Sequence, residues 1–137
     1  MLICVGNTCR SPMAGGLLEE ILRRSGTEAE IRTAGLSPGV GVNPRAVKVM
    51  KEIGIDISSH RPGKVTSALV NWADYVIPLT RELGEDLVEL LPAASAKIRW
   101  LDKDIDDPVS EQSASRYRET RDQLRAVLAV LARGLRQ

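Results

Sequence analysis

The first 22 residues constrain the fold more than any other part of the chain. Residues 2–5 form a short apolar run that ends at Gly6. Met13, Leu17 and Ile21 then recur four residues apart, which is the spacing of one face of an α-helix. The segment therefore predicts a strand, a tight loop and a helix in direct succession.

Two residues mark the expected start of this helix. We expect Ser11 to be the helix cap and Pro12 to occupy the first helical position, where its missing N–H costs nothing. The loop between the strand and the helix then leads directly into a helix N-terminus.

The rest of the chain alternates between strand-like and helix-like patterns. Further strands are predicted at residues 29–33, 75–79 and 96–101, and further helices at residues 44–53, 81–91 and 117–135. Such alternation predicts an α/β fold of three layers, with a four-stranded parallel sheet and helices on both of its faces. In such folds ligands bind at the carboxyl ends of the strands, where the first loop lies.

Composition limits the classes of protein. With 137 residues, 43% of them apolar, the chain is predicted to form a single domain over residues 1–137. A formal net charge of +1 gives no reason to expect a nucleic-acid partner. The longest wholly apolar run, residues 126–132, is far shorter than the roughly 20 residues that cross a bilayer, so we expect no membrane segment and a cytoplasmic protein. The sequence predicts no oligomeric state.

The loop after the first strand is predicted to bind phosphate. Backbone N–H groups wrapped in a loop before a helix form a nest for anions, and the helix dipole adds positive charge. Inorganic phosphate or another tetrahedral oxyanion fits such a site. The residues expected to bind the substrate are Val5, Gly6, Asn7, Thr8, Cys9 and Ser11.

Cys4 and Arg10 supply chemistry at the two ends of this loop. The positive field of the helix end favours the thiolate form of Cys4, which makes it a candidate nucleophile. The planar fork of Arg10 suits two oxygens of the transferred phosphoryl group. We expect the Ser11 hydroxyl to hydrogen-bond the thiolate, and Asn7 to adopt a tight or left-handed backbone conformation. Cys9 is either a buried loop residue or a resolving cysteine that forms a reversible disulfide with Cys4.

An acid is needed to protonate the leaving atom. The loop "DKDIDDP" offers four aspartates: Asp102, Asp104, Asp106 and Asp107. Asp107 is favoured as general acid because Pro108 limits its backbone freedom. The same carboxylate would later act as base on a water, so no metal and no organic cofactor is required. With two cysteines and one histidine, the chain also lacks the ligands of a structural zinc site. His60, in "SSHRP", is interpreted as a structural or surface residue.

The string "CVGNTCRSP" from Cys4 to Pro12 resembles the phosphate-binding loop of the low-molecular-weight protein tyrosine phosphatase family. The resemblance continues in "TAG" at residues 33–35, "GIDISSHRP" at residues 54–62, "ADYV" at residues 73–76, and the Asp-Pro pair at 107–108 with Tyr117 beyond it. It implies a phosphorylated protein substrate and a cysteinyl-phosphate intermediate. It also implies that Cys4 is the nucleophile, Arg10 the phosphate clamp and Asp107 the general acid.

Two substrates remain open in this interpretation. Family members that act on phosphotyrosine commonly carry isoleucine at the position of Thr8, whereas the family's protein-arginine phosphatases resemble this chain in carrying threonine. A hydroxyl there favours a thin guanidinium over a phenyl ring, so phosphoarginine is preferred to phosphotyrosine. Val109 stands where many relatives, arginine phosphatases included, place an aromatic wall. The loss of this wall weakens the case for an aromatic substrate, but it also departs from the pattern of the arginine phosphatases.

Two other functions are weighed against hydrolysis. The related thioredoxin-coupled arsenate reductases use further cysteines downstream of the anion loop, and this chain has none after Cys9. A non-enzymatic module that binds phosphate or phosphoproteins would need neither Cys4 nor Asp107.

Overall fold

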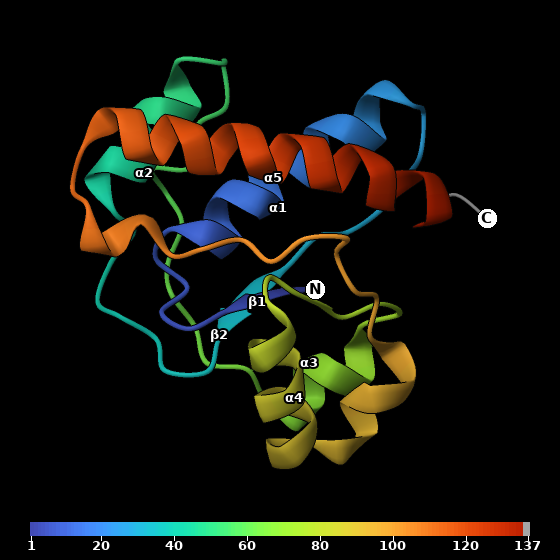
Figure 1. Cartoon of the computed structure of the whole chain (residues 1–137). Helices are drawn as coiled ribbons and strands as arrows, with labels where there is room; N and C mark the ends of the chain where they lie inside the picture. Colours follow the sequence, from blue (N-terminus) through green and yellow to red (C-terminus); the bar gives the residue numbers. More distant parts are fainter. Residues whose placement is uncertain (136–137) are drawn as a thin grey trace.

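The computed structural model describes residues 1–135 and has an α/β fold, with three short parallel strands between two layers of helices (Figure 1). The strands are β1 (Leu2–Cys4), β2 (Thr33–Gly35) and β3 (Ile77–Pro78), in the order β2-β1-β3. The α-helices are α1 (Arg10–Arg24), α2 (Pro44–Lys51), α3 (Ser67–Trp72), α4 (Arg81–Leu90) and α5 (Ala114–Leu135). Two 3₁₀ helices, η1 (Pro92–Lys97) and η2 (Pro108–Ser110), complete the described elements.

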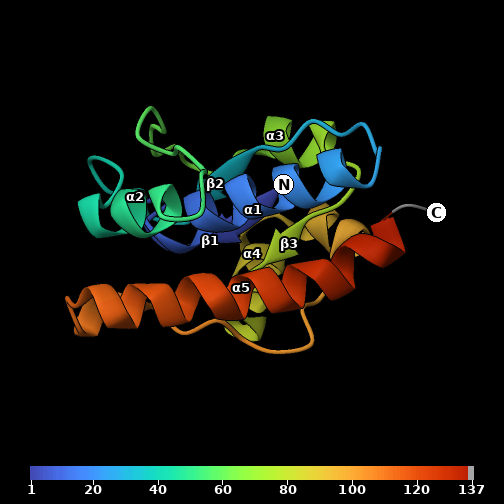
Figure 2. The ribbon, with the colours of Figure 1, turned by 90° about the horizontal axis from the view of Figure 1, so that it is seen from above.

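The central strand distributes its side chains between two cores. Leu2 and Cys4 of β1 belong to the core that is shared with α1, α2 and α5. Ile3 belongs to the core on the opposite face, with side chains of α3, α4 and η1. This alternation is the two-residue period of a strand that is buried on both faces. Figures 1 and 2 show α5 lying along α1 beside α2, with α3 and α4 beyond the sheet, which confirms the predicted layers.

The predicted fourth strand at residues 96–101 is wrong. Residues up to Lys97 form η1, and only Ile98 pairs with the sheet, through a single parallel bridge to Val76. The Val76 N–H donates to the Lys97 carbonyl and the Arg99 N–H donates to the Val76 carbonyl. The next bond of a parallel ladder would need an N–H at Pro78, which proline lacks. The ladder therefore stops after one bridge, and the sheet has three strands.

The predicted strand at residues 29–33 is also misplaced, because β2 begins only at Thr33. Its register on β1 pairs Leu2 with Thr33 and Cys4 with Gly35. Since β1 begins at Leu2, residues 29–31 have no partner strand alongside them, and Arg32 meets β1 only through its carbonyl, which accepts from the Leu2 N–H at 3.0 Å. The alternating pattern there marks a segment that leads into β2.

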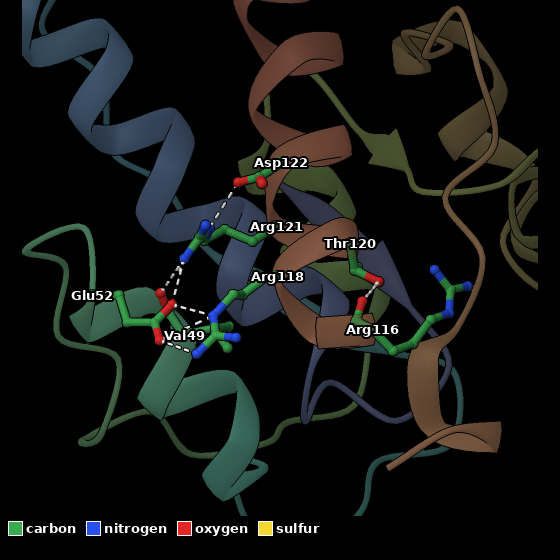
Figure 3. A network of polar contacts seen from close by, with 7 residues as sticks. All are labelled: Val49, Glu52, Arg116, Arg118, Thr120, Arg121 and Asp122. Carbon is green, nitrogen blue, oxygen red and sulfur yellow. Dashed lines mark hydrogen bonds and ion pairs between the residues drawn. The ribbon is translucent and has the colours of Figure 1, made fainter. Parts of the chain in front are cut away.

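Helices α2 and α5 are joined by an ionic cluster (Figure 3). Glu52, which follows α2, accepts three hydrogen bonds from the Arg118 guanidinium, at 2.9 Å (Nε–Oε1), 3.1 Å (Nε–Oε2) and 2.7 Å (Nη2–Oε2). Arg121 Nη1 donates a hydrogen bond to Glu52 Oε1 at 2.8 Å and another to the Val49 carbonyl at 2.9 Å. These contacts hold the C-terminal end of α2 against α5. Within residues 1–135, none of the helices combines the length and apolar character needed to cross a membrane.

Candidate active site

Cys4 ends β1 and lies at the bottom of a loop that leads into α1. The Asn7 backbone N–H donates to Cys4 Sγ at 3.2 Å, so the loop curls around the sulfur. Ser11 Oγ lies 3.0 Å from the same sulfur, as the sequence predicts. Because the first N–H groups of a helix have no partner within it, the start of α1 adds donors and a positive dipole beside Cys4.

The prediction that Ser11 caps this helix is wrong. The helix already begins at Arg10, its N-cap is Cys9, and no side chain caps it. Ser11 lies in the first turn, where its hydroxyl contacts Cys4 and accepts a hydrogen bond from Asn7 Nδ2 at 2.7 Å. A hydroxyl engaged by the thiol and by this amide is not available for the backbone N–H groups that a cap satisfies.

Asn7 holds the loop in shape. Its φ of 53° lies in the left-handed region, which confirms the expected conformation. Nδ2 donates to Ser11 Oγ and to Thr33 Oγ1, and Oδ1 accepts from the Gly63 N–H at 3.0 Å. His60 Nε2 lies 2.8 Å from the Asn7 carbonyl oxygen. The buried Asn7 side chain thus joins the loop to α1, β2 and the segment around residue 63. The contact of His60 with the Asn7 carbonyl agrees with the interpretation of this histidine as structural.

Segments that follow β2 cover the outer side of the loop. The Gly39 N–H donates to the Gly6 carbonyl at 2.9 Å, and the Asn43 N–H donates to the Thr8 carbonyl at 2.7 Å. A Cβ at Gly35 would lie 2.5 Å from the Val5 carbonyl oxygen, so only glycine permits this approach. Backbone carbonyls on the outer side of the loop are therefore satisfied by protein.

Arg10 connects the loop to the predicted acid. Its side chain is 7% exposed, and Nη1 donates to the Ile105 carbonyl at 2.9 Å. Nη2 lies 3.7 Å from Asp107 Oδ2, and the Asp107 side chain is 43% exposed. The structure thus brings Asp107 to Arg10, although the two are distant in sequence, and Cys4 contacts Ser11, the residue after Arg10.

The four aspartates of the acidic loop have different surroundings. Asp104 Oδ1 accepts from the Arg81 N–H at the start of α4, at 2.9 Å, which is a structural contact. Asp102 and Asp106 are exposed. Asp107 Oδ1 accepts from the Val109 N–H at 3.0 Å, which leaves Oδ2 facing Arg10.

Cys9 lies in the loop but is 7% exposed, and its thiol faces Met13 Sδ at 3.8 Å. Burial raises the pKa of Cys9 to about 12, with Asp107 and Cys4 adding to the effect. Cys4 and Cys9 are both free thiols. The geometry therefore favours the interpretation of Cys9 as a buried loop residue, because a neutral, covered thiol is a poor attacking group.

Thr8 and Val109 are the predicted specificity positions, and both are reachable from solvent. Thr8 is half-buried, and its Cγ2 would lie 2.8 Å from a Cβ placed on Gly39. Val109 is 55% exposed. No group of three or more His, Cys, Asp or Glu side chains within residues 1–135 is arranged to hold a metal ion.

The sequence did not identify three groups that contact the site: the Ile105 carbonyl, the Gly63 N–H and the side chain of Gln112. Two are backbone groups, which any residue type supplies. Gln112 is an exposed polar residue in a loop, and such residues are ordinary on protein surfaces.

Comparison with known proteins agrees with this geometry. The family model described as low molecular weight phosphotyrosine protein phosphatase matches residues 1–137. An arsenate reductase 2 of Staphylococcus haemolyticus is 34% identical over 126 residues, which are 92% of this chain and 89% of that protein. A Ralstonia solanacearum protein named "probable low molecular weight protein-tyrosine-phosphatase EpsP" is 35% identical over 116 residues, or 82% and 79% of the two chains.

The solved structures that are most similar in shape include two of YwlE. One is a YwlE mutant from Bacillus subtilis, and the other is described as YwlE arginine phosphatase with a phosphorylated active-site serine. Both are 30% identical to this chain with a TM-score of 0.93, covering 99% of this chain and 97% or 94% of the other. The motif, the loop geometry and the match over residues 1–137 together show that the chain belongs to the low molecular weight phosphotyrosine protein phosphatase family.

Proposed function

We propose that the protein is a cysteine-dependent phosphatase that removes phosphate from arginine side chains of proteins, in preference to tyrosine, as one domain over residues 1–137. The observation that carries the phosphatase proposal is the arrangement of Arg10. This buried guanidinium starts the helix beside Cys4 and lies 3.7 Å from the Asp107 carboxylate. This contact supports the roles proposed for Cys4 as nucleophile, Arg10 as phosphate clamp and Asp107 as general acid.

In the first step the Cys4 thiolate attacks phosphorus. A P–S bond forms while the P–N bond of phosphoarginine, or the P–O bond of phosphotyrosine, breaks. Asp107 gives its proton to the departing nitrogen or oxygen.

In the second step water attacks the phosphocysteine. Asp107, now ionised, takes a proton from the water, a P–O bond forms, and the P–S bond breaks to restore the thiolate. Ser11, 3.0 Å from Cys4 Sγ, stabilises the sulfur as it leaves. Inorganic phosphate is the product.

The preference for phosphoarginine rests on what surrounds the entrance. The chain has two tryptophans, two tyrosines and no phenylalanine. Three of these rings lie under arginines, in the pairs Arg32–Trp72, Arg81–Trp100 and Arg99–Tyr75, and Tyr117 is buried. At the entrance itself, Val109 stands where an aromatic wall would stack on a phenyl ring, whereas the Thr8 hydroxyl and the Asp107 carboxylate suit a guanidinium. The similarity to YwlE arginine phosphatase supports the same choice.

The test compares kcat/KM on phosphoarginine and phosphotyrosine peptides for the wild type and Thr8→Ile. We expect the wild type to prefer phosphoarginine, and Thr8→Ile to move the ratio toward phosphotyrosine by roughly tenfold. Thr27→Ile, in the loop that follows the far end of α1, is the matched control and should leave the ratio unchanged. An unchanged ratio in Thr8→Ile would remove the specificity argument.

Arsenate reduction is the second candidate, favoured by the names of several curated relatives, which are arsenate reductases of Staphylococcus species. Arsenate fits the same loop, but reduction to arsenite needs two electrons from thiols. The chain has only Cys4 and the buried Cys9, so we expect binding without efficient turnover. A phosphate-binding module without activity is the other alternative, and hydrolysis of p-nitrophenyl phosphate by the reduced protein would exclude it.

A further inference from the structure

Gln112 holds the turn that carries Asp107. It lies between η2 and α5, and its Nε2 donates to the Val109 carbonyl at 2.5 Å. The N–H of the same Val109 donates to Asp107 Oδ1 at 3.0 Å. Val109 is therefore held on one side by the carboxylate and on the other by the Gln112 amide.

Tyr117 anchors the other end of the Gln112 side chain. Its hydroxyl donates to Gln112 Oε1 at 3.2 Å and accepts from Asn43 Nδ2 at 3.1 Å. Arg45 Nη1 donates to the same Gln112 oxygen at 3.2 Å. The ring belongs to the buried core, and burial raises the pKa of Tyr117, so the phenol stays protonated and keeps its donor. Gln112 is thus attached to α5 through Tyr117 and to α2 through Arg45.

Asn43 extends the same path to the phosphate-binding loop. Its backbone N–H donates to the Thr8 carbonyl at 2.7 Å, and its Oδ1 caps α2 by accepting from the Arg45 N–H at 2.8 Å. With Oδ1 occupied in this way, the amide of Asn43 is oriented with Nδ2 toward Tyr117. The donor direction is consistent along the whole path from Asn43 to Val109.

We propose that Gln112 is a positioning residue that fixes the Asp107–Val109 turn relative to Thr8, through Tyr117 and Asn43. The inference rests on the proposed function, in which Asp107 protonates the leaving atom. Apart from this path, the Asp107 side chain contacts Arg10 at 3.7 Å and is 43% exposed. Losing the Gln112 contact frees the Val109 carbonyl to turn toward water, and the carboxylate is then less often in reach of the leaving atom.

The effect should depend on the leaving group. The test is kcat/KM on p-nitrophenyl phosphate and on phenyl phosphate, because kcat/KM reports the steps up to departure of the leaving group. Phenolate is the poorer leaving group and needs the acid more. Gln112→Ala should reduce kcat/KM on phenyl phosphate about three- to tenfold more than on p-nitrophenyl phosphate, which corresponds to the loss of one hydrogen bond.

Tyr117→Phe tests the path itself. It keeps the ring but removes the hydroxyl that joins Asn43 to Gln112, so it should produce a leaving-group effect of the same sign. In the double variant, Gln112→Ala with Tyr117→Phe, the extra loss of kcat/KM on phenyl phosphate should be smaller than the product of the two single losses, because both substitutions act through one contact. A double loss equal to that product would overturn the path through Tyr117.

Two reference variants separate the possible failures. Gln123→Ala, on α5 and without a contact to the acidic loop, should leave both activities and the thermal unfolding midpoint unchanged. Asp107→Asn should show the largest leaving-group effect. If Asp107→Asn shows it and Gln112→Ala loses equally on both substrates, the positioning role is refuted and the proposed function stands. If Asp107→Asn itself loses equally on both, the assignment of the acid is wrong and the positioning role falls with it.

Discussion

The loop proposed to cradle the anion and the loop proposed to carry the acid are built differently. In the first, Asn7 is fully buried and Arg10 is 6% exposed, and their neighbours come from β2, α1 and the segment around residue 63. In the second, Ile105 is buried and anchored to Leu79 and Arg10, whereas Asp107 and Val109 are exposed.

The difference separates two tasks. A preformed cradle binds charge without reorganising, and this is where electrostatic stabilisation of a transition state is most effective. The acid must meet leaving groups of different shape, and an exposed turn that is held at a few points allows this. Substitutions in the two loops should therefore affect different steps and also different properties.

The largest effect is expected at the nucleophile. Cys4→Ser should lower kcat by about 1,000-fold or more, because the serine hydroxyl is not ionised in this field. The cradle does not depend on the sulfur, so phosphate or vanadate should still bind, as isothermal titration can measure. Substantial turnover in this variant would remove Cys4 from its role.

The next effect concerns the acid. Asp107→Asn should lower kcat/KM on phenyl phosphate by about 100- to 10,000-fold and on p-nitrophenyl phosphate much less. Asp104→Asn is the matched control, because Asp104 contacts the start of α4, and it should leave the ratio between the two substrates unchanged. If Asp104→Asn changed the ratio of kcat/KM between the two substrates and Asp107→Asn did not, Asp104 would be the general acid.

A change in the cradle should cost stability as well as activity. Asn7→Ala removes the contacts with Ser11, Thr33 and Gly63 and places alanine at a φ of 53°, so the free energy of unfolding should fall by about 2–4 kcal/mol. Urea unfolding measures it. Asn71→Ala, on the exposed side of α3, should change it by less than about 0.5 kcal/mol. Equal changes in the free energy of unfolding for Asn7→Ala and Asn71→Ala would contradict the conclusion that Asn7 holds the loop in shape.

The smallest effect comes from the buried thiol of Cys9. Burial raises its pKa from 9.0 to about 12, so the folded state keeps the proton that the unfolded chain releases. The resulting stability is complete below pH 9 and is lost as the pH rises toward 12. Between pH 8 and pH 10, the free energy of unfolding of the wild type should fall by about 1 kcal/mol more than that of Cys9→Ala. Parallel pH profiles for the two proteins would show that Cys9 does not titrate this way.

Sequence reasoning succeeded where the chemistry is local. The left-handed Asn7, the contact between Ser11 and Cys4 and the helices at residues 81–90 and 114–135 all follow from short patterns. It failed where a distant partner decides. The local sequence predicts Ser11 as a helix cap, but in the structure its hydroxyl contacts the Cys4 thiol and accepts a hydrogen bond from the Asn7 amide.

The sheet shows the same limit. Residues 96–101 have strand-like character, but the missing N–H of Pro78 on the neighbouring strand stops their pairing. Gln112 has no signal of its own, because its role depends on Tyr117 and Asn43, and Asn43 lies far from it in the sequence.

The two isolated bridges also protect the sheet. Gly35 on β2 is paired on its outer side with Lys64, and Val76 beside β3 is paired on its outer side with Ile98. Each edge of the three-stranded sheet is therefore covered by a short loop segment, and Pro78 withholds a donor on one of them. Neither edge offers a long row of free backbone groups to another chain, so this very small sheet is built against strand addition and fibrous aggregation.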